Sequence, residues 1–211
     1  CAQLSADGFA GDPKPVISEE WHLSYPFVFE HDGQDYMLAE ALQSSAVPLY
    51  RCETFPDKWV FVKNLLTDIA AVDPTLIEKD QRWYLFVNVI EQHGGASWDE
   101  LFIYMADDLL EGEGTPHPMN PVVSDVRSSR PAGKIFSLNG NLYRPSQNCA
   151  GSYGYGMSIN RVDVLTPTDY QECQVTTITP DWSPRVRGVH TLSHANGVTL
   201  SDALFRRPKY W

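Results

Sequence analysis

The sequence predicts an all-β fold built from related units of four strands. Two observations support this prediction: a phrase that occurs three times and the weakness of helical pattern. The phrase is YPFVFEHDGQDYML at 25–38, DPTLIEKDQRWYLF at 73–86 and, with two extra residues, RPAGKIFSLNGNLYR at 130–144. Each copy has a proline in second place and a tyrosine ten to twelve residues later. The segment ADDLLEGEG, from Ala106, allows a helical turn that its two glycines would end.

Each copy predicts two strands joined by a tight turn. The turns are the polar groups His31-Asp32-Gly33 and Lys79-Asp80-Gln81, which separate short apolar runs. Two further apolar runs follow each hairpin in order. The third strands are expected in VPLYRCE from Val47, LFIYMAD from Leu101 and YGMSINRVD from Tyr155. The fourth strands are expected in WVFVKNLL from Trp59, PVVS from Pro121 and QVTTITP from Gln174.

Four strands per unit, with about 50 to 60 residues between repeat prolines, fit a propeller blade better than a sandwich strand set. We predict one domain over 1–211. It would contain blades at about 24–72, 73–129 and 130–189 and a partial blade at 190–211. PKPVISEE, at 13–20, predicts an outer strand without inner partners. About three complete blades and partial terminal blades would leave sheet edges open, so we expect either closure by the terminal strands or a homo-oligomer.

Composition sets limits on the partners. The 211 residues are 43% hydrophobic and carry a net charge of -11, which argues against nucleic acid and anionic membranes. No apolar run reaches the roughly 20 residues of a membrane helix. Because the chain begins at Cys1, we expect a truncated fragment, with a lipid-modified cysteine as the alternative. Cys149 and Cys173 are the one plausible disulfide pair, and buried free thiols are the other interpretation. Nothing in the sequence predicts a cellular location.

The residue before each repeat proline differs from copy to copy. It is Tyr25, then Asp73, then Arg130, while His190 opens the last unit. In a propeller the start of the innermost strand faces the central channel. An aromatic residue, an acid and a base at equivalent channel positions indicate contact with a ligand.

A second set of polar residues stands four positions after each repeat tyrosine. These residues are Glu40, Asn88 and Gln147. An even offset in a strand returns to the same face, so this face meets solvent or ligand. Two interpretations carry equal weight here: ligand contacts, or channel-lining polar groups bonded to one another and to water.

Longer phrases resemble a known family over nearly the whole chain. They include HLSYPFVFEHDGQDYM, DELFIYMADDLL, TPHPMNPVVSDVRSSRPAG, LYRPSQNC, YGYGMSIN, LTPTDY and GVHTL. They resemble the propeller domain at the N-terminus of plant glucosamine inositolphosphorylceramide transferases, whose bacterial relatives stand alone or beside formyltransferase-like domains. That family in turn resembles the five-bladed propellers of arabinanase and xylosidase type. The resemblance implies a five-bladed-propeller-like fold, here incomplete.

The glycosidase resemblance also implies roles for particular residues. Those enzymes use a base in the first blade, an orienting acid in the third, a proton donor in the fourth and often a histidine in the fifth. Asp73 in the DP pair resembles the orienting acid, and His190 in GVHTL resembles the histidine. The first-blade segment would fall upstream of Cys1. SSRP places Arg130 where the proton donor would stand, so that position is unmatched.

Glycoside hydrolysis needs two carboxyl groups, and Asp73 supplies one. Glu40 is the candidate partner, because a carboxyl group in an apolar channel beside another acid can have a raised pKa and act as the acid. The alternative interpretation is a structural salt bridge from Glu40 to Arg130 or Arg144. Whether the chain is an enzyme is therefore left undecided by the sequence.

We predict a glycosidase-like propeller that recognises a carbohydrate at the channel, with Asp73 and Glu40 as catalytic candidates. Polar side chains would bind sugar hydroxyls and tyrosines would cover apolar sugar faces, Tyr153 among them. The substrate-binding candidates are Tyr25, Asn88, Arg130, Arg144, Gln147 and His190. No cofactor or metal site is expected, although the sequence does not exclude a calcium ion bound in the channel. The alternative function is a non-catalytic scaffold or accessory module for a transferase domain or for self-assembly.

Overall fold

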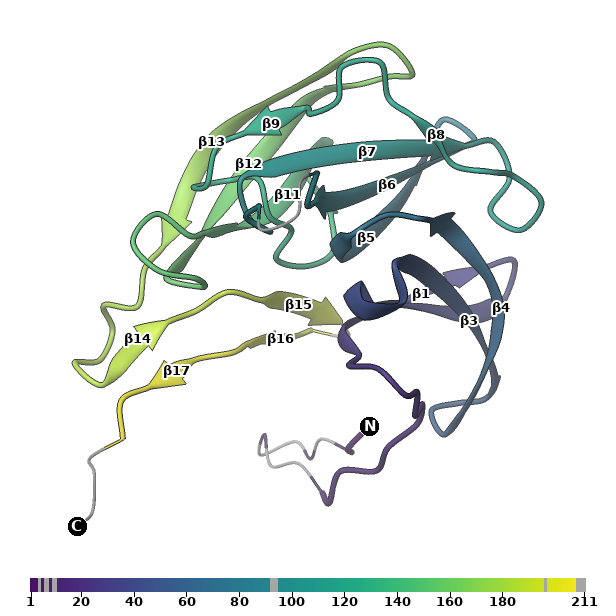
Figure 1. Cartoon of the computed structure of the whole chain (residues 1–211). Helices are drawn as coiled ribbons and strands as arrows, with labels where there is room; N and C mark the ends of the chain where they lie inside the picture. Colours follow the sequence, from purple (N-terminus) through teal and green to yellow (C-terminus); the bar gives the residue numbers. More distant parts are fainter. Residues whose placement is uncertain (4, 6–7, 9–10, 92–94, 196, 208–211) are drawn as a thin grey trace.

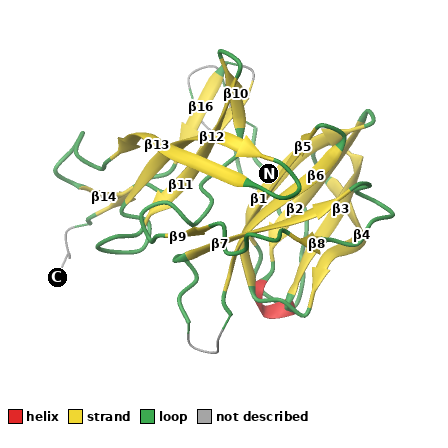
Figure 2. Cartoon of the chain, turned by 90° about the horizontal axis from the view of Figure 1, so that it is seen from above, coloured by secondary structure: helices red, strands yellow, loops and turns green. Residues whose placement is uncertain are grey.

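The computed structural model describes residues 1–3, 5, 8, 11–91, 95–195 and 197–207. Within these residues the chain is made of β-strands and loops, with one 3-10 turn at Leu42–Ser44 (Figure 2). The predicted all-β class is confirmed. No helix in this part of the chain is long and apolar enough to cross a membrane.

Three antiparallel sheets of related design follow one another in the sequence. The first contains β1 (Ser24–His31), β2 (Gln34–Glu40), β3 (Ala46–Thr54) and β4 (Lys58–Thr67). The second contains β5 (Ala71–Lys79), β6 (Arg82–Val89), β7 (Glu100–Ala106) and β8 (Thr115–Pro116), with β9 (Val123–Ser124) also against β7. The third contains β10 (Phe136–Leu138), β11 (Asn141–Asn148), β12 (Gly156–Leu165) and β13 (Tyr170–Ile178).

The last part of the chain forms two small sheets instead of one. The first pairs β14 (Val186–Gly188) with β17 (Leu204–Phe205), and the second pairs β15 (Leu192–Ala195) with β16 (Val198–Ser201). The β15–β16 hairpin lies within the segment where the sequence predicts a further first hairpin. In Figure 1 the sheets follow one another around an arc, with the N-terminal segment and β17 on its lower side.

The repeated phrase forms a hairpin in all three sheets. Its two central turn residues have positive φ in each case, which is the backbone of a type I′ turn and matches the twist of the flanking strands. These pairs are Asp32 and Gly33, Asp80 and Gln81, and Asn139 and Gly140. The polar turn residues in each copy therefore favour the same hairpin geometry.

Alternation along β6 explains how the sheets pack. Trp83, Leu85 and Val87 enter the hydrophobic cluster shared with the first sheet. Tyr84 and Phe86, which point the other way, enter the cluster shared with the third sheet. The second sheet is thus covered on both faces, which accounts for the uninterrupted apolar run of this strand.

A close backbone contact helps to attach the last hairpin to the third sheet. Leu192 N donates to Ala132 O at 2.7 Å, and Gly133 and Leu192 form a parallel bridge. A Cβ atom on Gly133 would lie 1.9 Å from Leu192 O, so only glycine permits this approach. The site described next depends on this attachment, since His190 begins the segment.

Three details differ from the sequence predictions or settle open ones. Residues 13–20 form no strand, because Pro13 and Pro15 lack the N–H groups that a strand ladder needs. The segment from Ala106 forms a turn and no helix, with Asp108 Oδ1 accepting from the backbone of Leu110 and Glu111. All four cysteines are free, so no disulfide links Cys149 to Cys173.

Candidate functional site

The inner strands of the first two sheets begin with the same backbone irregularity. Tyr25 and Asp73 have φ values of 47° and 50°, in the left-handed region, each directly before a proline. The strand register shifts at both places, between Ser24 and Phe27 and between Val72 and Thr75. Such a conformation costs a non-glycine residue about 1–3 kcal/mol. Both copies keep it, and it takes the two side chains out of the regular strand alternation.

Four predicted site residues meet around the Asp73 carboxyl group, and we call them the Asp73 group: Glu40, Asp73, Arg130 and Gln147. Asp73 Oδ2 accepts from Arg130 Nε at 2.6 Å and from Gln147 Nε2 at 2.7 Å. The backbone N–H of Asp73 donates to Glu40 Oε2 at 3.2 Å, and Arg130 Nη2 reaches the same oxygen at 3.5 Å. Asp73 is 3% exposed. The first sheet supplies Glu40, the second Asp73 and the third Gln147.

Neighbouring backbone and loop atoms hold the donors of this group in place. Gln147 Nε2 also donates to Pro131 O at 3.0 Å. Arg130 Nη1 donates to Ser97 O at 3.0 Å and to Ser97 Oγ at 2.9 Å. The Arg130 carbonyl accepts from Gln147 N at 2.7 Å. The guanidinium is therefore fixed by contacts on all of its nitrogens, which leaves it little freedom to move away from Asp73.

Two carboxyl groups share one guanidinium in this buried place. Burial raises the pKa of Asp73 to about 7, against the opposing effect of Arg130 and with reinforcement from Glu40. Burial lowers the pKa of Arg130, but Asp73 outweighs it and the pKa stays above its ordinary value. Asp73 can therefore exchange a proton near neutral pH while Arg130 stays charged.

Tyr25 and His190 lie beside the group and do not bond to it directly. The Tyr25 hydroxyl shares a hydrogen bond of 2.9 Å with Thr75 Oγ1, and burial of this hydroxyl, followed by the Asp73 charge, raises its pKa. His190 Nδ1 contacts Asp202 Oδ2. The His190 ring packs edge-on against Tyr153, which lies under Arg130. Both residues thus border the Asp73 group through one intermediate side chain.

Arg144 and Asn88 are not brought to the Asp73 group. Arg144 is buried and bonds to Glu172, with Nε–Oε2 at 2.8 Å and Nη2–Oε1 at 2.6 Å. It stands three residues before Gln147, and an odd offset in β11 sends the two side chains to opposite faces. Asn88 Nδ2 donates to Glu100 O, and Asn88 Oδ1 has no hydrogen-bond partner among the described residues.

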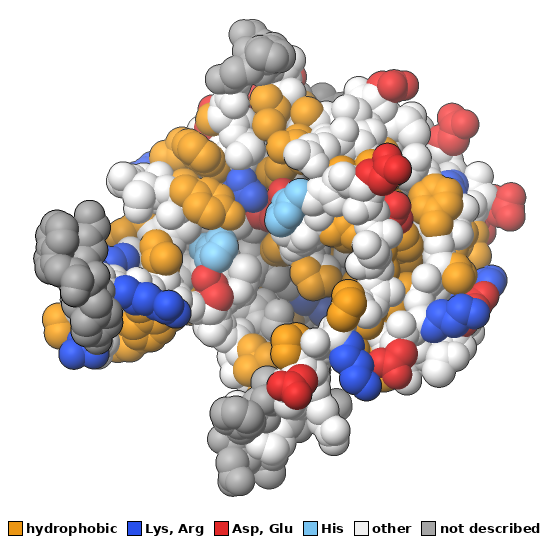
Figure 3. Space-filling model, turned by 60° about the horizontal axis from the view of Figure 1, so that its bottom comes forward, with side chains coloured by type: hydrophobic (Ala, Val, Ile, Leu, Met, Phe, Trp, Pro, Cys, Tyr) orange, Lys and Arg blue, Asp and Glu red, His pale blue; other side chains and the backbone are white. Residues whose placement is uncertain are grey.

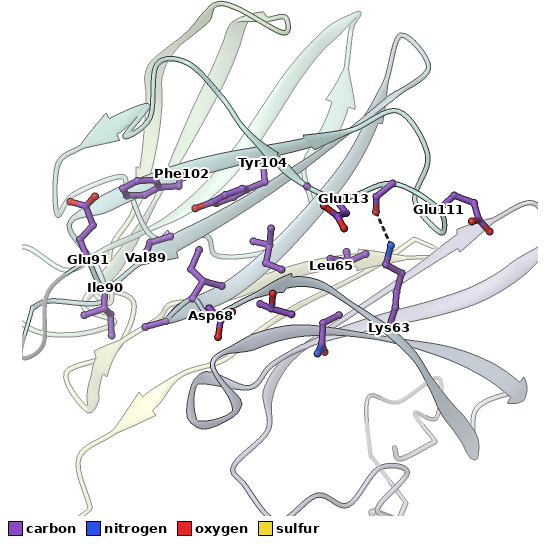
Figure 4. Close-up of a pocket in the computed structure, with 17 residues that line it drawn as sticks. Lys63, Leu65, Asp68, Val89, Ile90, Glu91, Phe102, Tyr104, Glu111 and Glu113 are labelled. Carbon is purple, nitrogen blue, oxygen red and sulfur yellow. Dashed lines mark hydrogen bonds between the residues drawn. The ribbon is translucent and has the colours of Figure 1, made fainter.

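The larger hollows among the described residues lie outside the Asp73 group. A groove of about 770 Å³ runs between β4 and the second sheet, where Phe102 and Tyr104 face Leu65 and Asp68 (Figure 4). None of the predicted site residues lines it. A cleft of about 600 Å³ lies between the start of β1 and the last hairpin, and Tyr25 lines it. Among the described residues, no group of three or more His, Cys, Asp or Glu side chains is placed to hold a metal ion.

Sequence reasoning missed several residues that contact the site. Ser97 and Asp202 occupy no position in the repeated phrase, so nothing in the repeat pointed to them. Trp98 packs against Tyr153 with ring centroids 6.1 Å apart. The sequence offered one indication for Trp98, namely its position in the loop before β7. Loops at the ends of inner strands border the channel of a propeller.

Comparison with solved structures identifies the class of fold. An exo-β-1,3-galactanase from Clostridium thermocellum has a TM-score of 0.61 at 15% identity, over 92% of this chain and 43% of that one. A GH43_1 enzyme from Xanthomonas citri complexed with xylotriose has a TM-score of 0.57 at 15% identity, over 86% of this chain and 66% of that one. The fold is that of the β-propellers found in such glycosidases.

Sequence comparison shows the family to which this chain belongs. Residues 14–187 match the family described as glucosamine inositolphosphorylceramide transferase 1, N-terminal, and the chain belongs to it. The protein of that name from Oryza sativa subsp. japonica is 35% identical over 162 residues, and the one from Arabidopsis thaliana is 32% identical over 162. These matches cover 76% of this chain and 22% and 21% of the two relatives, so the chain spans about a fifth of their length.

Proposed function

We propose that this chain binds a carbohydrate against the Asp73 group. One observation carries the proposal: two carboxyl groups, a guanidinium and a side-chain amide lie in contact with one another. Each of the three sheets contributes at least one residue to this group. Sugar hydroxyls both donate and accept hydrogen bonds, and such a set offers both kinds of partner. A propeller fold shared with enzymes whose structures contain xylotriose supports the choice of ligand class.

Binding is favoured over hydrolysis by the way the carboxyl groups are used. Hydrolysis needs one carboxyl group to protonate the leaving oxygen and another to activate water or attack carbon. Here both Asp73 and Glu40 contact the same guanidinium, and Asp73 is buried. Hydrolysis is the second candidate because a pKa of about 7 lets Asp73 donate a proton at neutral pH.

An accessory role beside a transferase domain is the alternative from another class. Its support is the family membership of a chain that spans about a fifth of relatives named as transferases. Exposed apolar side chains on the last strands also suit a covering domain or a second copy of the chain. These are Val198, Leu200, Leu204 and Phe205. The propeller would then position the neighbouring domain or assemble with itself.

The test is binding of an immobilised glycan panel by the wild-type chain and by Asp73→Asn and Glu40→Gln. We expect the wild type to bind at least one glycan and each variant to lose at least tenfold in affinity. Arg161→Gln, which alters an exposed ion pair with Asp163, is the matched control and should keep its affinity. If the wild type binds no glycan, the carbohydrate proposal is wrong and the accessory role is favoured. Release of reducing sugar by the wild type and by neither carboxyl variant would favour hydrolysis.

A further inference from the structure

Trp98 and His190 each pack against Tyr153, which lies under Arg130, and the three aromatic side chains come from three different loops. Tyr153 belongs to the loop between β11 and β12, Trp98 to the loop before β7, and His190 to the segment between β14 and β15. Neither the repeat nor the Asp73 group requires them. We propose that Trp98, Tyr153 and His190 form a stacking platform for a neutral glycosyl residue next to the Asp73 group, an inference that rests on the proposed carbohydrate function.

Tyr153 is the centre of this platform. The Arg130 guanidinium carbon lies 4.9 Å from the centre of its ring. The Trp98 ring centre is 6.1 Å away at an interplanar angle of 47°, and the His190 ring centre is 5.4 Å away at 66°. Arg130 is itself bonded to Asp73 at 2.6 Å. A sugar on the platform would therefore have the Asp73 group within reach of its hydroxyls.

The platform is held in place before any ligand arrives. Arg130 ties down the Trp98 loop through its two hydrogen bonds to Ser97. A Cβ atom on Gly154 would lie 3.2 Å from the His190 ring, so the glycine lets the Tyr153 loop pack directly on that ring. Asp202 fixes the other side of His190 by accepting from its backbone N–H at 2.9 Å. Preorganised aromatic rings bind with little loss of conformational freedom.

Exposure separates this cluster from ordinary core packing. Tyr153 is 47% exposed, whereas core tyrosines such as Tyr36 and Tyr84 are buried. Trp98 and His190 are partly exposed as well. Half-exposed rings beside buried polar groups match the two sides of a sugar, an apolar C–H face and a rim of hydroxyls. The face in Figure 3 is hollowed near its middle, where histidine, basic and acidic side chains lie close to hydrophobic ones.

The charged groups around the platform favour neutral sugars over anionic ones. Asp73, Glu40 and Asp202 are carboxyl groups near the platform, while Arg130 is already paired with the first two and His190 contacts the third. No cation among these residues is left for the carboxylate of a uronic acid or for a phosphate, and the net charge of the chain, -11, also repels anions. A neutral glycosyl residue meets neither obstacle.

The experiment is titration calorimetry of the whole chain with three probes: β-1,3-galactotriose, xylotriose and tri-galacturonic acid. The variants are Tyr153→Ala, Trp98→Ala and Tyr153→Phe, each checked for folding by thermal melting. We expect a neutral probe to bind the wild type, about tenfold loss in both alanine variants, and less than threefold loss in Tyr153→Phe, which keeps the ring. Tyr155→Ala, which removes another exposed tyrosine two residues away, should bind as the wild type does.

The outcomes distinguish the two proposals. A wild type that binds no probe and no panel glycan overturns the proposed function and the platform together. Wild-type binding that is lost in Asp73→Asn and kept in both alanine variants overturns the platform alone. Binding of tri-galacturonic acid as tight as that of the neutral probes overturns the assignment to neutral sugars. If Tyr153→Ala or Trp98→Ala fails to melt cooperatively, the leucine variant of the same residue replaces it and should show the same loss.

Discussion

At the scale of single residues, the Asp73 group is an imbalance of charge in a buried place. Two carboxyl groups meet one guanidinium, and the remaining donors are the Gln147 amide and a backbone N–H. The position before the repeat proline predicted Tyr25, Asp73 and Arg130, and the position four residues after the repeat tyrosine predicted Glu40, Asn88 and Gln147. The structure puts four of these six into direct contact, and Tyr25 and Asn88 lie outside that contact.

Removing the guanidinium tests how much the group depends on it. Arg130→Met should lower the free energy of unfolding by about 3–5 kcal/mol at pH 8, because it leaves buried carboxyl groups without their cation. Urea unfolding followed by fluorescence measures the loss. Arg161→Met removes a similar ion pair at an exposed place and should cost about 0–1 kcal/mol. Equal losses in the two variants would contradict the central place given to Arg130.

The raised pKa of Asp73 predicts how stability depends on pH. The pKa is about 7 in the folded state against an ordinary 3.8, so between these values the folded state holds more protons than the unfolded state. The contribution of Asp73 to stability is thus complete below pH 3.8, falls as pH rises and is lost above pH 7. Each pKa unit corresponds to about 1.4 kcal/mol, so the whole change amounts to a few kcal/mol.

Denaturant unfolding at pH 5, 6.5 and 8 checks this prediction. The wild type should lose stability relative to Asp73→Asn across the series, because asparagine cannot ionise. Parallel pH profiles for the two proteins would mean that Asp73 is ionised throughout and that Arg130 outweighs burial.

At the scale of elements, the hairpins were predictable and their attachments were not. Alternating apolar residues around a polar pair specify a hairpin locally, and each predicted turn adopts type I′ geometry. The strand predicted at 13–20 is absent, because its two prolines lack the N–H groups that pair strands. Arg144 pairs with Glu172 on β13 and lies apart from the Asp73 group, and nothing in the sequence shows that β13 lies across β12 from β11. Long-range pairing of this kind is not a local property of a chain.

One of the three turns carries a residue that its geometry disfavours. Gln81 has a φ of 61°, and the equivalent turn positions hold Gly33 and Gly140. Gln81→Gly should therefore raise the free energy of unfolding by about 0.5–1 kcal/mol, the left-handed cost of glutamine less the extra flexibility of unfolded glycine. Thermal and urea unfolding measure it, with Gln171→Gly in β13 as a control that should destabilise. A loss of stability in Gln81→Gly would contradict the assigned turn.

At the scale of the whole molecule, the sheets are joined in series by hydrophobic clusters of unequal size. Among the residues that the structure describes, the cluster between the first and second sheets has fifteen buried residues, the next has nine, and the one at the last hairpin has three. The fold class could be predicted because the repeat is visible in the sequence. The size of each contact between sheets could not, because it depends on which faces meet.

Unequal attachment predicts unequal protection of backbone amides. In hydrogen exchange, the amides of β6 should exchange slowest and those of β15 and β16 much faster, through local opening of the last hairpin. Mass spectrometry of peptides from both regions measures this difference. Equal protection would mean that the contact between Gly133 and Leu192 holds the last hairpin as firmly as the larger clusters hold the central sheet.

The most direct test of the account is a crystal structure of the chain with the neutral oligosaccharide that binds it most tightly. The account predicts a sugar ring on Tyr153, with at least one hydroxyl within hydrogen-bond distance of Asp73, Glu40 or Arg130. A sugar bound elsewhere, such as in the groove between β4 and the second sheet, with the Asp73 group untouched, would contradict it.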